Sequence, residues 1–332
     1  MHDSTETLPK PSKTADSSAP LVIVNPKSAA GSTSDKWTQL ASDLRTHFGP
    51  YDVDFTGFAG HAAELAESAA RGGRKFIIAC GGDGTINEVA NGILNSETDA
   101  ELGVLPSGTG GDFRRTLGLP RSSRDAAAVL KKGATKKIDV GKVTFLDSED
   151  REISRYFLNV SSVGLAADVI KRVKASDSLD WLPLEGVRGK ANYAISALKE
   201  VLDLEAETIR IKVDEKKERS IQTIAFCIAN ARFFGGGMKI APDASLTDGL
   251  LDVVNIGDIS TGRILMNALS FYRGTIAELK EVKLTQARRI AIRAADPKHT
   301  ILLETDGELP GKLPAVYEIV PNALRVRVPR AS

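Results

Sequence analysis

The chain has 332 residues, of which 42% are hydrophobic and 26% charged, a globular composition whose length suits two domains. The formal net charge of +1 excludes a strong overall attraction to nucleic acid, so no nucleic-acid partner is expected. Two cysteines inside apolar runs, Cys80 and Cys227, and four histidines without clustered spacing argue against a disulfide framework and a zinc site.

The chain begins with a polar segment and contains no long apolar run. Residues 1–19 are polar and contain no apolar core, which predicts a disordered tail rather than a signal peptide. No apolar run approaches the length that spans a bilayer, so no transmembrane segment is expected. We therefore expect a cytoplasmic protein whose contact with a membrane, if any, is peripheral.

The first part of the chain alternates short strands with amphipathic helices. Strands are predicted at 21–25, 51–56, 75–80 and 102–106, and between them apolar residues recur at helical spacing. Strands that alternate with helices require crossover connections and a mostly parallel sheet. Residues 20–140 are therefore predicted to form an α/β domain.

The pattern changes after residue 140. Most segments between 141 and 332 read as strands, several of them joined by short turns, and 213–220 has the composition of a solvated hairpin turn. Helices are expected only near 165–205 and 260–272. This second domain is predicted to be an antiparallel β-sandwich.

A glycine-rich loop follows the third strand, in the stretch CGGDGTINEVANGI at 80–93. Its three glycines let the backbone approach a ligand closely, and a turn that feeds a helix N-terminus presents free N–H groups to an anion. Thr85 and Glu88 have the spacing of a capping box, which predicts a helix beginning at about Ile86. Asp83 suits phosphate that arrives with Mg²⁺. A simple glycine-rich turn is the alternative interpretation.

Two further loops have the same placement. NPKSAAGS at 25–32 follows the first strand, and LPSGTGGDFRRTLGLP at 105–120 follows the fourth. The carboxyl ends of neighbouring parallel strands meet at one crevice, so the three loops together predict a nucleotide site. Neither a P-loop nor a G-x-G-x-x-G fingerprint is present.

Five stretches together resemble the diacylglycerol kinase catalytic domain superfamily. In chain order they are NPKSAAG, GGDGTINEVANGI, PSGTGGDF, APDASLTDGLLDVV and TDGE. They look most like the bacterial soluble lipid kinases, relatives of sphingosine kinases and, more distantly, of NAD kinases and 6-phosphofructokinases. The resemblance spans about 20–328 and implies an NAD kinase- or phosphofructokinase-like α/β domain followed by a sandwich.

The resemblance implies that ATP binds at the three loops. The implied nucleotide-binding residues are Asn25, Pro26, Lys27, Ser28, Ala29, Thr56, Gly81, Gly82, Asp83, Gly84, Thr85, Ile86, Asn87, Glu88, Gly108 and Thr109. An ordinary strand-end hydroxyl is an equal alternative for Thr56. The third loop departs from the family pattern G-T-x-N-D, because Gly111 replaces the asparagine while Asp112 is retained.

The resemblance also assigns acids. Asp306 and Glu308 in TDGE lie where the family has its catalytic base, and either could accept the proton of a substrate hydroxyl. Asp83 and Asp112 are implied as further acids of the catalytic site. A structural Mg²⁺ is implied at the main-chain carbonyls of Ser245 and Leu250 and the carboxylate of Asp248. Plain Asp-Gly turns are the alternative at both places.

These implications define an ATP- and Mg²⁺-dependent kinase that phosphorylates a lipid hydroxyl, with diacylglycerol-like or sphingoid acceptors. The expected partner is a lipid substrate at the membrane surface, and a homodimer is left open. Apolar loop residues at 181–184 suit an acyl chain or a membrane surface, with packing between domains as the alternative. An NAD kinase and a catalytically inactive nucleotide-binding regulator are the alternative functions.

Overall fold

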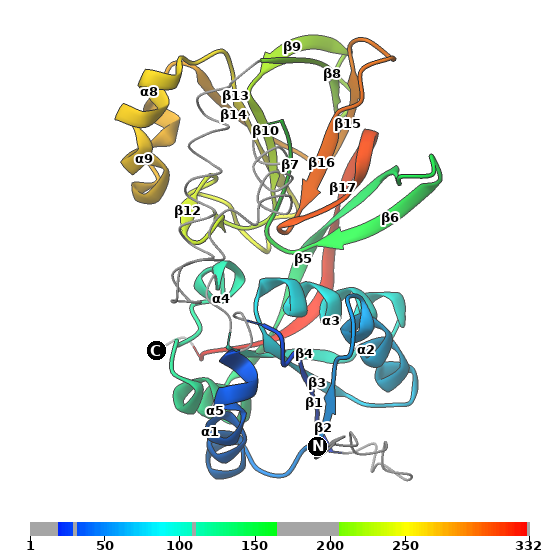
Figure 1. Ribbon diagram of the computed structural model, residues 1–332, viewed down its shortest axis with the longest axis vertical. Coiled ribbons are helices and arrows are strands. Elements are labelled where there is room, and N and C mark those ends of the chain that lie inside the picture. The colour runs from blue at the N-terminus through cyan, green and yellow to red at the C-terminus, as the bar shows by residue number, and fades with distance from the viewer. Residues whose placement is uncertain (1–18, 29–31, 108–110, 165–205, 331–332) are drawn as a thin grey trace, which may run out of the picture.

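A computed structural model describes residues 19–28, 32–107, 111–164 and 206–330. The predicted tail and the helices expected near 165–205, with the apolar residues at 181–184, lie outside these segments. The described chain forms two parts stacked along the long axis (Figure 1), an α/β part and a part built mainly of strands. The predicted fold class is confirmed.

The α/β part contains a parallel sheet in the order β2-β1-β3-β4, extended by the end of the last strand, β17. Its strands are β1 (Leu21–Val24), β2 (Asp52–Phe55), β3 (Phe76–Gly81) and β4 (Glu101–Pro106). Its helices are α1 (Ser32–His47), α2 (His61–Arg71), α3 (Asp83–Asn95), α4 (Asp112–Thr116) and α5 (Ser123–Lys132).

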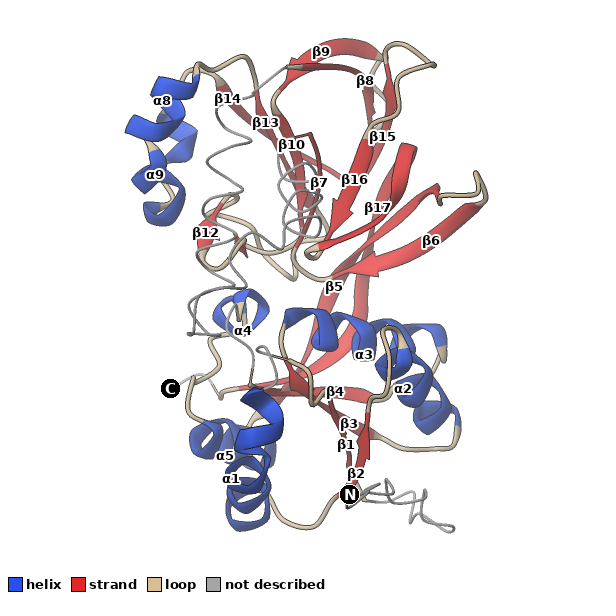
Figure 2. Cartoon of the chain, in the orientation of Figure 1, coloured by secondary structure: helices blue, strands red, loops and turns tan. Residues whose placement is uncertain are grey.

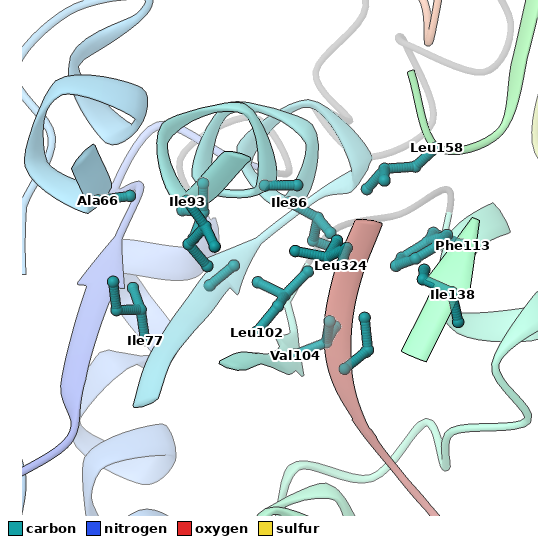
Figure 3. Packing of buried hydrophobic residues seen from close by; sticks show 14 of the residues in the cluster. Ala66, Ile77, Ile86, Ile93, Leu102, Val104, Phe113, Ile138, Leu158 and Leu324 are labelled. Carbon is teal, nitrogen blue, oxygen red and sulfur yellow. The ribbon is translucent and has the colours of Figure 1, made fainter. Parts of the chain in front are cut away.

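Both faces of this sheet are covered, which explains why its strands are continuous apolar runs rather than alternating ones. Alternate residues of β1 serve opposite cores: Leu21 and Ile23 pack on the α2–α3 side, whereas Val22 and Val24 pack on the α1–α5 side. Figure 3 shows the first of these cores, where Ile86 and Ile93 of α3 lie over the sheet. The carboxyl ends of the strands are thereby left as the accessible edge.

The second part is a sandwich of antiparallel strands (Figure 2). One layer runs β14-β13-β10-β7-β16-β17, and the other contains β9, β8, β15, β17, β5 and β6, so that β17 belongs to both. The strands are β5 (Ala134–Leu146), β6 (Glu152–Phe157), β7 (Val160–Gly164), β8 (Glu207–Val213), β9 (Arg219–Thr223), β10 (Ala225–Ala229), β13 (Leu251–Ile256), β14 (Val282–Ala287), β15 (Arg289–Ala294), β16 (Leu302–Thr305) and β17 (Glu308–Val328). An apolar core that includes Phe157, Phe226 and Tyr317 fills the space between the layers.

Smaller elements decorate one side of the sandwich. They are the hairpin β11 (Phe233–Phe234) and β12 (Met238–Lys239), the helices α8 (Thr261–Met266) and α9 (Ala268–Arg273), and the 3₁₀ helix η1 (Ile276–Glu278). The helices expected near 260–272 and the turn between β8 and β9 are both present.

The two parts share strands rather than meeting at a linker. Strand β5 runs through residue 140, where the sequence predicts the boundary, and pairs with β17 along most of its length. β17 then pairs in parallel with β4, which places Leu324 and Val326 in the core of the α/β part. The end of the chain therefore completes the first sheet, and relative motion of the two parts is opposed by two continuous strands.

Candidate active site

The three predicted loops meet, as their positions at the ends of parallel strands require. Asn25 after β1 donates from its amide to the Thr85 hydroxyl, 3.1 Å away in the first turn of α3. Thr33 at the start of α1 bonds both Ser28 (2.5 Å) and Ser107 after β4 (3.0 Å). These hydrogen bonds connect the three loops at the carboxyl-terminal edge of the parallel sheet.

The helix after the glycine loop begins earlier than predicted, at Asp83 with Gly82 as N-cap, and no side chain caps it. The predicted capping box is therefore wrong. Glu88 points instead to α2, where its carboxylate accepts the backbone N–H groups of Gly60 (3.0 Å) and Ala62 (3.2 Å). The start of α2 has no side-chain cap of its own, so its free N–H groups compete successfully for this carboxylate. An uncapped α3 suits an anion, because its first N–H groups lack a side-chain acceptor.

Asp83 caps a different helix. Its two carboxylate oxygens accept the N–H groups of Asp112 and Phe113, each at 3.1 Å, at the start of α4. Gly111, the N-cap of α4, has φ 68°, a left-handed conformation that glycine and asparagine both tolerate. A side chain at this position would start 3.1 Å from Arg114 Nε, so Gly111 also leaves room for that guanidinium.

Asp112 is buried and also paired. Its carboxylate accepts from the Arg115 guanidinium (2.7 Å) and from the N–H of Gly236 (2.8 Å), in the β11–β12 turn of the sandwich. Burial raises the pKa of Asp112, and the nearby charge of Asp83 raises it further. Asp112 thus connects the third loop to the second part of the molecule.

Asp306 lies in the turn between β16 and β17, with φ 47°, and its carboxylate holds the corner between β6 and β7. One oxygen accepts the N–H groups of Asn159 (2.9 Å) and Val160 (3.1 Å). The other accepts the N–H of Leu158 and the side-chain amide of Asn87, both at 2.7 Å. Burial raises the pKa of Asp306 to about 6, against the lowering effect of the three backbone donors.

The charge of Asp83 also raises the pKa of Asp306, so the acid of the turn lies within electrostatic reach of the glycine loop. Across the described segments, however, no three or more histidine, cysteine, aspartate or glutamate side chains are arranged to hold a metal ion.

Glu308 has a different environment. Its side chain is 40% exposed and pairs with Arg155 of β6 at 2.8 Å. The structure therefore separates the two acids that the sequence leaves equivalent: one is enclosed by four donors, and the other forms a half-exposed ion pair.

The sequence reasoning missed Glu304, two residues before Asp306. Its buried carboxylate accepts the Ser162 hydroxyl and the Gly307 N–H, both at 2.6 Å. Burial raises the pKa of Glu304 to about 7. Glu304 holds the far side of the turn that carries Asp306, and no local motif indicates this.

The reasoning also missed Asn91, although a signal was present. Asn87 and Asn91 are four residues apart on α3 and both are buried, which is costly for amides unless they are bonded. Asn91 donates to the Tyr156 carbonyl (3.0 Å) and accepts the Tyr156 N–H (2.9 Å), while Asn87 bonds the same carbonyl. The two amides fix α3 to β6, and so fix the glycine loop to the sandwich.

The predicted structural metal site lies in the loop 245–250 before β13. Asp248 is exposed and its carboxylate accepts the Leu250 N–H at 3.1 Å, while the Ser245 hydroxyl accepts the N–H of Thr247 at 3.3 Å. Burial and the charge of Asp248 raise the pKa of Asp252 to about 6. A cation beside Asp248 would relieve that repulsion, so the local charge suits the predicted set, which stays a prediction.

The remaining predicted residues are distributed as follows. Pro26 and Lys27 lie in the first loop, where the Lys27 N–H donates to the Asn25 side chain, and the Thr56 N–H donates to the Val24 carbonyl. Ala29, Gly108 and Thr109 lie outside the described segments. Both cysteines are buried and free, as expected.

The described chain thus joins a parallel sheet with convergent glycine loops, through strands that both parts share, to a sandwich that contributes acids. Residues 159–328 match the family model described as the YegS C-terminal NAD kinase beta sandwich-like domain, and residues 19–143 match the diacylglycerol kinase catalytic domain. The chain belongs to this diacylglycerol kinase-like family, whose members are phosphotransferases.

Similar proteins extend over most of the chain. A diacylglycerol kinase of Mycobacterium tuberculosis is 29% identical over 93% of this chain and 94% of its own length. A diacylglycerol kinase of Staphylococcus aureus is 30% identical over 78% of this chain and 76% of its own. A solved diacylglycerol kinase structure from Bacillus anthracis shares the fold, with a TM-score of 0.67, 21% identity and coverage of 94% and 97%.

None of the helices in the described segments is long and apolar enough to cross a membrane.

Proposed function

We propose that the chain is an ATP- and Mg²⁺-dependent lipid kinase that transfers the terminal phosphoryl group to the hydroxyl of a diacylglycerol-like or sphingoid acceptor. The observation that carries the proposal is the 2.7 Å hydrogen bond from Asn87 to Asp306. It joins the helix of the glycine loop to the acid that four donors enclose in the sandwich turn. The curated relatives named diacylglycerol kinases support the choice of a lipid acceptor.

The glycine loop and the uncapped start of α3 are the parts that fit a nucleotide. The Cβ of a residue at position 84 would meet no atom within 4 Å, so the loop leaves open space beside the helix N-terminus. Free N–H groups there stabilise negative charge on phosphate. Mg²⁺, when bound, neutralises charge on the phosphates during transfer.

Asp306 is the proposed proton acceptor. Four donors occupy the lone-pair sites of its carboxylate, so a substrate hydroxyl must replace one of them. Asn87 is the donor that can leave, because its amide nitrogen also contacts the Tyr156 carbonyl at 3.1 Å. The hydroxyl oxygen then bonds the terminal phosphorus, the bond from that phosphorus to ADP breaks, and the hydroxyl proton passes to Asp306. A pKa of about 6 suits an acceptor that is ionised near neutral pH.

The test is transfer of label from radiolabelled ATP, with Mg²⁺, to diacylglycerol, sphingosine, ceramide and phosphatidylglycerol in mixed micelles, with NAD as a further acceptor. We expect one lipid to be labelled, and the label to depend on Asp306. Label on NAD alone would make the protein an NAD kinase. ATP binding without label on any acceptor would favour a nucleotide-binding regulator.

The matched control for the role of Asp306 is Glu308→Gln, two residues away in the same turn. It changes an acid to its amide without altering any donor to Asp306. Loss of label with Asp306→Asn but not with Glu308→Gln supports the assignment.

A further inference from the structure

The helical hairpin α8–α9 carries a cluster of exposed apolar side chains. Met266, Leu269 and Tyr272 have 85%, 63% and 53% of their surface exposed. The other exposed large hydrophobic residues of the described segments stand singly, at Val53, Phe58, Ile153 and Leu284. Single exposed apolar residues are ordinary, whereas a cluster marks an interaction surface.

The cluster is not an accident of loose packing. Ile264 and Phe271 anchor the hairpin to a core that includes Ile276, and the Asn267 amide bonds the Arg263 carbonyl at 2.8 Å. Leu269 and Tyr272 are three residues apart on α9, which places them on one side of that helix, and Met266 is the last residue of α8. The anchored residues thus hold the hairpin in place while the apolar trio, which we call the 266–272 cluster, faces outward.

Two arginines lie on the α8–α9 hairpin, and one of them is paired with an acid. Between Asp258 and Glu278 the only charged residues are Arg263 and Arg273, and Arg263 forms an ion pair with Glu281 at 3.1 Å. Arg273 is exposed beside Tyr272. Exposed apolar side chains beside a tyrosine and an exposed arginine are typical of an element that lies in a bilayer interface.

We propose that the α8–α9 hairpin docks on a bilayer that contains anionic lipid, with the 266–272 cluster inserted among the headgroups and Arg273 facing lipid phosphate. A second copy of the chain fits this surface less well, because a stable dimer interface contains roughly 20–30 residues a side and the cluster consists of only three exposed apolar side chains. The choice of a lipid surface rests on the proposed function, since an enzyme with a membrane lipid as acceptor must meet the bilayer.

The position of the hairpin suits this role. α9 packs on β12, and the turn between β11 and β12 supplies the Gly236 N–H that Asp112 accepts. Figure 1 shows α8, α9, β12 and α4 on the same side of the molecule. Only the β11–β12 hairpin therefore separates the proposed docking surface from Asp112 in the candidate active site.

The test is co-sedimentation of the full chain with vesicles of phosphatidylcholine alone and of phosphatidylcholine with phosphatidylglycerol. We expect wild type to bind the anionic vesicles, and the triple variant with Met266→Ser, Leu269→Ser and Tyr272→Ser to bind at least about ten-fold more weakly. Arg273→Gln is expected to weaken binding to anionic vesicles about five-fold and to leave neutral vesicles unaffected. Ile153→Ser, an exposed apolar change on β6, is the matched control and is expected to bind as wild type.

Three results would overturn the proposal: wild type that binds neither vesicle, a triple variant that binds like wild type, or a control that loses binding equally. A wild-type dimer that becomes monomeric in the triple variant, with no vesicle binding, would identify a second copy as the occupant. If the triple variant does not fold, Met266→Ser alone serves. Activity on a short-chain, monomeric acceptor separates the two proposals, because this acceptor does not require a bilayer. Absence of that activity would refute the proposed kinase function, whereas the vesicle-binding results alone test the proposed docking surface.

Discussion

Replacing Asp306 by asparagine tests whether this residue both stabilises the fold and accepts the proton of the substrate hydroxyl. The carboxylate divides four donors between two oxygens, two on each. An amide offers only one oxygen, so either orientation leaves two donors facing its NH₂ group. Each buried donor without an acceptor costs about 1–3 kcal/mol, and because Asp306 is half-buried we expect a loss of about 2–4 kcal/mol in unfolding free energy.

The chemical loss is separate from the loss of stability. Removal of a general base lowers turnover by about 10²- to 10⁴-fold. Glu308→Gln removes one half-exposed ion pair, for which solvent screening limits the loss of stability to about 1 kcal/mol, and turnover should stay close to wild type.

Urea denaturation measures the first quantity, and ADP release at saturating ATP, at a temperature where all variants are folded, measures the second. ATP affinity by calorimetry shows that the nucleotide loops are intact. The reasoning is refuted if Glu308→Gln abolishes turnover while Asp306→Asn keeps it, or if Asp306→Asn unfolds at the wild-type urea concentration.

Three further predictions follow from the buried groups. If Asp306 with a pKa of about 6 accepts the proton, kcat/KM falls as pH drops through about 6 because the protonated acid cannot accept, and a rate profile without this limb excludes the assignment. Burial raises the pKa of Glu304 to about 7 from 4.5, so the folded state holds this proton more tightly than the unfolded state. Unfolding free energy should therefore fall by up to about 3 kcal/mol as pH rises from 4.5 to 7, and the Glu304→Gln variant should show a flatter pH dependence in urea titrations. Gly92→Ala should lower the melting temperature through a loss of about 1–3 kcal/mol, because its Cβ would clash with the Ala63 carbonyl and Ala66 of α2; an unchanged melting temperature would show that α2 and α3 shift apart freely.

The sequence predicts what local periodicity controls. The strands at 21–25 and 75–80, the helices between them and the meeting of three loops all follow from apolar spacing and the geometry of parallel sheets. The fold class is recovered for the same reason. The hairpin at 213–220 and the helices near 260–272 are likewise local features.

The failures involve partners distant along the chain. Glu88 has the spacing of a capping box, but the free N–H groups of α2, 26 and 28 residues away, take its carboxylate. Asp83 bonds α4 about 30 residues on. Local spacing cannot show which of several acceptors a free helix end will find, because that choice depends on tertiary packing. The return of β17 to the first sheet is missed for the same reason.

The residues between the two parts explain why chemistry and architecture cannot be separated here. Asn87 lies in the second turn of α3, donates to the β6 carbonyl of Tyr156 and donates to the Asp306 carboxylate. Asn91, one turn later, bonds the same strand through both its amide atoms. An apolar helix face would pack α3 without fixing its rotation, whereas two buried amides require one register against β6 to be satisfied. The same bonds that satisfy those amides hold the start of α3 against the turn that carries Asp306, so the register of α3 fixes the glycine loop relative to that acid.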